Sequence, residues 1–105
     1  MNIPLQITMR DVPHSDALEA RIRESAAKLE EIHSRITSCR VTIDRSDGHS
    51  HEGRQFDVCI DVRAPGHEEV VSTLKHHEDV YVALRDAFDA TRRQLDDAIH
   101  KRAAT

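Results

Sequence analysis

The strongest constraint on the fold is an unbroken alternation of apolar and polar side chains over residues 56–63. The apolar positions of this segment are Phe56, Val58, Ile60 and Val62. Because successive side chains of a strand point to opposite faces, the alternation predicts a strand with one face in the core and one in solvent. The chain must therefore build a sheet that is covered on one side.

The same alternation predicts three further strands, at residues 3–8, 39–44 and 69–75. The inward face of the last one is ambiguous because it contains two adjacent valines. The polar stretch 45–54 holds an Asp-Gly pair and a further glycine, which favours the loop of a long hairpin. An Ala-Pro-Gly sequence at 64–66 predicts a second turn.

Two amphipathic helices are predicted, at roughly 15–34 and 79–101. Ser15 can cap the first, and Asp16 and Glu19 suit the positive end of its dipole. The apolar stripes recur at helical spacing and comprise Leu18, Ile22, Ala26, Leu29, Ile32 and Ile36 in the first helix and Val80, Leu84, Phe88, Thr91, Leu95 and Ile99 in the second. The predicted fold is a single α+β domain over 1–105 with the order β-α-β-β-β-α. Both helices cover one face of a four-stranded sheet whose first two strands are parallel and whose others are antiparallel.

Composition narrows the function. Of the 105 residues, 32% are charged and the net charge is -4, which excludes the globally positive surface of a non-specific nucleic-acid binder. Any contact with RNA must be local. The two cysteines form no Cys-x-x-Cys pair and lie on opposite faces of adjacent predicted strands, so we expect no disulfide. Without a leader-like or membrane-spanning segment, a cytoplasmic location is expected.

Neither catalysis nor cofactor binding is expected. No serine or cysteine lies in a nucleophile motif, and three glycines give little material for a phosphate loop. Two histidine clusters, His49-x-His51 and His76-His77, leave open a zinc or nickel site if the hairpin loop folds back along the sheet. The alternative is that these are exposed loop histidines without a metal-binding role.

Basic residues supply the remaining candidate site. Seven-residue spacing places Arg21, Lys28 and Arg35 in a line beside the apolar stripe of the first helix. The last helix carries Arg85, Arg92, Arg93 and Lys101, so neighbouring helices would bring these cations together. The alternative is an ordinary solvated helix face, because i,i+4 ion pairs are available at Arg85–Asp89, Asp89–Arg93, Arg92–Asp96, Arg93–Asp97 and Asp97–Lys101.

Several short segments in and around the two predicted helices carry a further signal. The most specific is Glu-Asp-Val-Tyr-Val-Ala-Leu at 78–84, and others are Ala17-Leu18, Lys28-Leu29-Glu30, Ile36 and Arg93-Gln94-Leu95. Together they resemble the ribosome hibernation promoting factor family, whose other branch is the ribosome-associated translation inhibitor called protein Y. The resemblance spans nearly the whole chain and implies the same element order, similar to a double-stranded-RNA-binding domain. It is closest to the short form of the family.

We expect the chain to be monomeric when free. The resemblance implies a non-enzymatic factor that binds the small ribosomal subunit and its rRNA in the channel for mRNA and tRNA and stops translation. It uses no membrane and no small-molecule substrate. Lys28, Arg35, Arg93 and Lys101 match basic positions of the family, so these are predicted phosphate contacts together with Arg92, and Arg21 and Arg85 support them. Two other hypotheses stay open: a protein-binding regulatory module on the same scaffold, and a metal-responsive protein that uses the histidine clusters.

Overall fold

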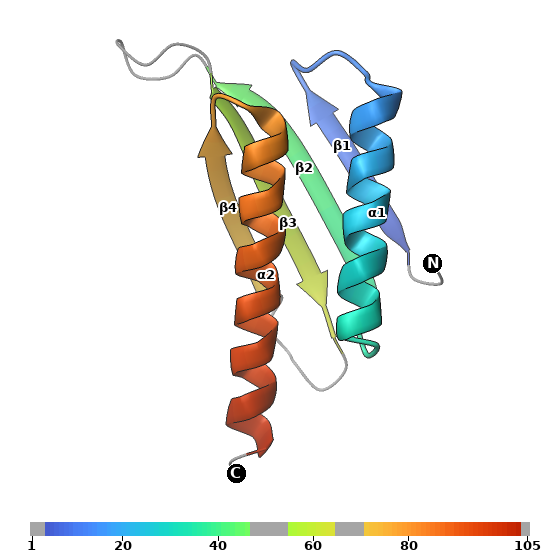
Figure 1. Cartoon of the computed structure of the whole chain (residues 1–105), viewed down its shortest axis with the longest axis vertical. Helices are drawn as coiled ribbons and strands as arrows, with labels where there is room; N and C mark the ends of the chain where they lie inside the picture. Colours follow the sequence, from blue (N-terminus) through green and yellow to red (C-terminus); the bar gives the residue numbers. More distant parts are fainter. Residues whose placement is uncertain (1–3, 47–54, 65–70, 104–105) are drawn as a thin grey trace.

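The computed structural model describes residues 4–46, 55–64 and 71–103 (Figure 1). Four strands form one sheet in the order β1-β2-β3-β4, and both helices lie on the same face of it. The elements are β1 (Leu5–Arg10), α1 (Asp16–Ile32), β2 (Ser38–Ser46), β3 (Gln55–Arg63), β4 (Val71–His77) and α2 (Val80–Ala103). The predicted α+β fold and its β-α-β-β-β-α order are confirmed.

The strand register explains how one side of the sheet becomes the core. β1 pairs with β2 in parallel, and the other two pairs are antiparallel. Val41 lies opposite Ile60, and Ile43 lies opposite Val58; all four are fully buried. The intervening positions point to the side that carries no helix, which we call the open face. Each strand therefore contributes alternate residues to the core and to solvent, as the sequence predicts.

Aliphatic stripes of the two helices complete the core. Leu18, Ile22 and Leu29 of α1 and Leu84 and Leu95 of α2 are all buried. α2 packs over β3 and β4, whereas α1 lies toward β1. Direct contact between the two helices is sparse. The core therefore fixes each helix to the sheet.

Local signals set where α1 begins and ends. The Ser15 side chain accepts a hydrogen bond from the Leu18 backbone N–H at 3.2 Å, as expected of a helix cap. The helix ends at Ile32, and the backbone N–H of His33 donates to the Leu29 carbonyl at 2.8 Å. The helix predicted over 15–34 is therefore two residues too long at its end. Arg35 lies in the following turn and does not extend the line of Arg21 and Lys28.

The strand predictions need smaller corrections. β1 continues to Arg10, and β2 continues to Ser46, beyond their predicted ends at 8 and 44. β4 includes His76 and His77, which alternate between the two faces of the sheet. Its inward face contains Thr73, which is buried, while the outward Leu74 remains 62% exposed. The two adjacent valines leave the inward face of this strand ambiguous in the sequence, and the structure shows that its buried central residue is a threonine.

Buried hydroxyls join β4 to α2. Thr73 Oγ1 and Thr91 Oγ1 are 2.7 Å apart, and Thr91 Oγ1 donates to the Ala87 carbonyl at 2.8 Å. Both threonines are buried, so each hydroxyl needs a protein partner. This network satisfies the polar atoms beneath α2 and holds that helix in register with the edge strand.

Candidate RNA-binding groove

The two helices run side by side in the same direction (Figure 1). Residues from both helices line a groove between them. Contacts near its two ends confirm the parallel alignment, because Arg21 meets Tyr81 and His33 meets Asp96. At 1.5 Å per residue these contacts are roughly 20 Å apart along the helices. The groove has a volume of about 410 Å³ and is lined by Arg21, Glu24, Ser25, Lys28, Leu29, Ile32, Tyr81, Val82, Leu84, Arg85, Phe88, Asp89 and Arg92.

Four of the seven predicted site residues line this groove: Arg21 and Lys28 from α1, and Arg85 and Arg92 from α2. Two carboxylates, Glu24 and Asp89, also line it, so the groove carries an excess of positive charge although the whole chain is at -4. Local segregation of charge, which the sequence required for any RNA contact, is therefore present in the fold.

The other three predicted residues lie elsewhere. Arg35 is exposed in the turn after α1, and Arg93 is exposed on α2, but neither lines the groove. Arg93 follows Arg92 directly, and a one-residue step turns a side chain by about 100° around a helix, which accounts for the difference. Lys101 belongs to α2, but its side chain lies outside the described residues.

The ion pairs on α2 differ from the i,i+4 pairs expected of an ordinary solvated helix face. Lys28 Nζ is 3.4 Å from Glu24 Oε1, and Arg85 Nη2 is 3.5 Å from the adjacent Asp86. Among the described side chains, none of the four i,i+4 pairs available between Arg85 and Asp97 closes to within 4.0 Å. Over the same residues, Arg92 has no carboxylate at ion-pair distance. Its guanidinium is thus available to an external anion.

An aromatic side chain and an apolar floor distinguish this groove from a purely ionic surface. Tyr81 is 40% exposed, and the guanidinium carbon of Arg21 is 5.7 Å from its ring centroid, within cation–π range. Leu29, Leu84 and Phe88 form the floor, and Ile32 remains 54% exposed beside them. Tyr81 was not among the predicted site residues. Its helical spacing from Arg85 and Arg92 could have placed it on the same face.

A second inter-helix contact, also absent from the sequence predictions, joins His33 to Asp96. Nε2 of His33 is 2.8 Å from Oδ1 of Asp96, within ion-pair distance. The imidazole is nearly buried, whereas the carboxylate is half exposed. Asp96 therefore reaches across to α1 and leaves Arg92 of its own helix unpaired. No helical periodicity signals such a contact, because the two residues are far apart in sequence.

The two histidine clusters that leave a zinc or nickel site open lie only partly within the described residues. His49 and His51 lie outside the described residues. His76 and His77 point to opposite faces of β4, and His77 Nδ1 accepts the Asp79 backbone N–H at 2.9 Å. The donors that do converge are different ones, from His14, Asp16 and Glu19 at the start of α1.

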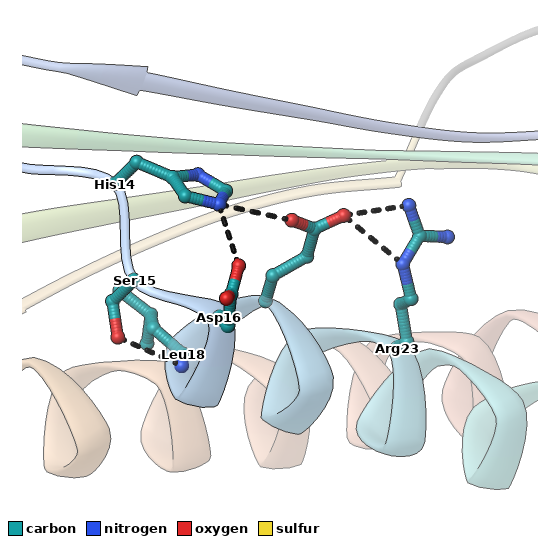
Figure 2. Close-up of polar contacts among 6 residues, drawn as sticks. His14, Ser15, Asp16, Leu18 and Arg23 are labelled. Atoms are coloured by element: carbon teal, nitrogen blue, oxygen red, sulfur yellow. Dashed lines mark hydrogen bonds and ion pairs between the residues drawn. The ribbon is translucent and has the colours of Figure 1, made fainter.

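That group already has internal partners (Figure 2). His14 Nε2 is 2.9 Å from Asp16 Oδ1 and 3.7 Å from Glu19 Oε2. Glu19 also accepts a hydrogen bond from Arg23 Nη2 at 2.8 Å. A cation placed there would compete with this guanidinium and with the positive end of the helix dipole. Asp16 and Glu19 lie in the first turn of α1, where carboxylates suit the positive end of the helix dipole, which accounts for them without a metal.

The two thiols are separate and unreactive in character. Cys39 is buried in the core and Cys59 lies on the open face, as the alternation predicts, and both are free. Burial, and to a smaller extent the charge of Asp61, raises the pKa of the Cys39 thiol to about 11. Burial and the same carboxylate also raise the pKa of Cys59. Neither environment favours the nucleophilic thiolate.

None of the described helices is long and apolar enough to cross a membrane.

Fold and groove together define an α+β domain that concentrates cations between two parallel helices on one side of a sheet. Two solved structures share this architecture. A ribosomal subunit interface protein from Coxiella burnetii superposes with a TM-score of 0.79 at 15% identity, covering 93% of this chain and 99% of that protein. The protein Y N-terminal domain of Thermus thermophilus gives a TM-score of 0.68 at 23% identity, covering 90% and 94% of the two chains.

Sequence comparison assigns the family. Residues 5–103 match the family model described as Sigma 54 modulation protein / S30EA ribosomal protein, and the chain belongs to this family. It is 29% identical over 90 residues to the ribosome hibernation promotion factor of Deinococcus radiodurans. That match covers 86% of this chain but 46% of the relative, so the chain spans about half the length of that protein. The family resemblance noted in the sequence is confirmed.

Proposed function

We propose that this chain is a non-enzymatic ribosome-binding factor that uses the α1–α2 groove to bind rRNA of the small ribosomal subunit. The observation that carries the proposal is the groove itself, in which Arg21, Lys28, Arg85 and Arg92 gather on a chain of net negative charge. Membership of a family with ribosome hibernation and subunit interface proteins supports the choice of partner. The domain over 1–105 would act in the cytoplasm and be monomeric when free.

In this mechanism the domain acts as a rigid body that occupies a site on the small ribosomal subunit. The sheet and core fix both helices, so the groove cations meet rRNA phosphates with little loss of conformational entropy. Arg93 and Lys101 would add contacts beyond the groove on α2, and Arg35 would add one from the turn after α1. A domain seated in the channel for mRNA and tRNA would exclude both ligands and thereby inhibit translation. No covalent step is involved.

Co-sedimentation with purified small subunits through sucrose, at about 50 and 200 mM salt, tests binding. We expect the unmodified protein to pellet with the subunits and to dissociate as salt rises, because each phosphate contact releases counterions. The double variant Arg92→Glu/Arg93→Glu should bind at least about ten-fold more weakly. Arg10→Glu/Arg40→Glu, with the same charge change on the open face, is the matched control.

Normal co-sedimentation of Arg92→Glu/Arg93→Glu would remove α2 from the interface. An in vitro translation assay tests the channel separately. Inhibition should rise with occupancy of the small subunit and be lost in the α2 variant. Full occupancy without inhibition would place the protein outside the channel.

A further inference from the structure

The groove contains more than phosphate recognition needs. A surface that binds phosphates alone requires cations, whereas here an apolar floor of Leu29, Leu84 and Phe88 lies between them. Two large side chains, Ile32 and Tyr81, stay substantially exposed along the same groove. Leaving such area in water is unfavourable, and a ligand with an apolar face would cover it. The bases of a paired RNA helix are stacked inside the helix and would not reach this floor.

Tyr81 is held in place from the opposite helix. Arg21 of α1 lies over its ring, and the Tyr81 backbone N–H donates to Asp79 Oδ1 at 2.9 Å at the start of α2. Tyrosine rings and arginine guanidinium planes are the groups on which proteins stack unpaired bases. The pair therefore provides a stacking surface at one end of the groove.

The volume of the groove and the hydrogen-bonding groups that line it fit a single nucleotide. A volume of about 410 Å³ lies at the small end of ligand sites. Asp89 lines the groove beside the cations and, among the described residues, has no cation at ion-pair distance. A carboxylate repels a phosphate but accepts a hydrogen bond from the exocyclic amine of a base. Ser25 adds a hydroxyl in the same lining.

We propose that the α1–α2 groove binds one unpaired nucleotide of an RNA strand. Its base stacks on the Tyr81–Arg21 pair, while Lys28, Arg85 and Arg92 hold its flanking phosphates. This inference rests on the proposed RNA-binding function and deepens it, because phosphate contacts alone would recognise only shape and charge. The groove thereby selects a place where rRNA is unpaired.

Two RNA hairpins that differ only by one bulged adenosine test the proposal. The unmodified protein should bind the bulged hairpin at least about five-fold more tightly, because stacking of one base on an aromatic ring is worth that much or more. Tyr81→Leu should remove the preference, and Tyr81→Phe should keep it. Leu74→Ser, which alters an exposed apolar side chain on the open face, should leave it unchanged. A 2-aminopurine at the bulge should be quenched by the unmodified protein and not by Tyr81→Leu.

Three results would overturn the proposal. Equal affinity for the two hairpins, with normal co-sedimentation of Tyr81→Leu on small subunits, would show that the groove reads phosphates only and would leave the proposed ribosome binding intact. Displacement of the bulged hairpin by an equal concentration of adenosine monophosphate would make a free nucleotide the ligand. Failure of the unmodified protein to bind either hairpin or ribosomes would reject both proposals together.

Discussion

On the open face of the sheet, Arg10 and Arg40 lie opposite carboxylates of neighbouring strands, Asp44 and Asp61, whereas in the groove cations outnumber carboxylates two to one. Arg10 Nη1 is 3.9 Å from Asp44 Oδ2, and Asp61 accepts a further hydrogen bond from Ser72. Both of these open-face arginines therefore face a carboxylate on the neighbouring strand, whereas Arg92 of the groove has no carboxylate at ion-pair distance among the described residues. Arrangement, more than composition, determines which side of an acidic chain can bind an anion.

The two sides of the sheet differ also in apolar burial. Ile60 is 0% exposed beneath the helices, and Leu74 is 62% exposed on the open face. This difference gives the largest expected effect on stability. Ile60→Ala should lower the free energy of unfolding by about 2–5 kcal/mol because it removes buried methyl groups and leaves a cavity. Leu74→Ala should lower it by less than about 1 kcal/mol. Urea denaturation of both variants measures the contrast, and similar losses would contradict the assignment of faces.

The thiols test the same contrast through pH. Because burial raises the folded-state pKa of Cys39 from 9.0 to about 11, its contribution to stability is present below pH 9 and is lost as pH rises toward 11. Between pH 8 and 11 the unmodified protein should lose about 2 kcal/mol more than Cys39→Ala. The same comparison with Cys59→Ala, on the more exposed side of the sheet, should give a smaller difference in the loss of stability between pH 8 and 11. Denaturant titrations at each pH measure both differences. A larger effect for Cys59 would contradict the assignment of Cys39 to the core and of Cys59 to the open face.

The buried hydroxyls give a smaller effect. Thr91→Val keeps the shape of the side chain but removes the closer partner of the buried Thr73 hydroxyl, at 2.7 Å, and leaves it only the Ala87 carbonyl at 3.3 Å. We expect a loss of about 1–2 kcal/mol. Thr42→Val on the open face is the control and should change stability by about 0.5 kcal/mol or less, because its hydroxyl lies on the side of the sheet that faces water. Equal thermal shifts for the two variants would mean that the Thr73–Thr91 network adds nothing to the attachment of α2.

The open-face ion pair gives the smallest effect. Arg10→Gln should change stability by less than about 0.5 kcal/mol, since both partners are exposed and solvent screens their attraction. It should also leave co-sedimentation with small subunits unchanged. Weakening comparable to that of a groove variant would extend the RNA-binding surface to the open face and remove the contrast between the two sides.

Periodicity predicts the layers of this fold well, because the buried side of each strand or helix is marked by its local pattern of apolar and polar residues. The alternation through Val58 and Ile60 and the helical stripe through Ile22 each identify the buried side correctly. Boundaries follow less closely, since they depend on the backbone conformation of single residues such as His33, whose φ of -122° and ψ of 81° are not helical. That conformation ends α1 early and moves Arg35 off the helix.

The site is predicted only in part for a related reason. Spacing brings Arg21 and Lys28 to one side of α1, but it does not tell which α2 residues face them. That depends on the parallel alignment of the helices, which the contacts of Tyr81 and Asp96 reveal. The His33–Asp96 contact also explains why Arg92 lacks its expected i,i+4 partner. Long-range packing, absent from any local pattern, determines both.

The central claim is that an excess of cations in the groove binds rRNA phosphates, and the salt dependence of small-subunit binding tests it most directly. Arg85→Gln/Arg92→Gln should lower the magnitude of the slope of log K against log salt by about 1.4–1.8, corresponding to two lost phosphate contacts. The charge-matched Arg10→Gln/Arg40→Gln should leave that slope unchanged. Equal slopes for the two double variants, or a slope unaffected by the groove pair, would contradict the account.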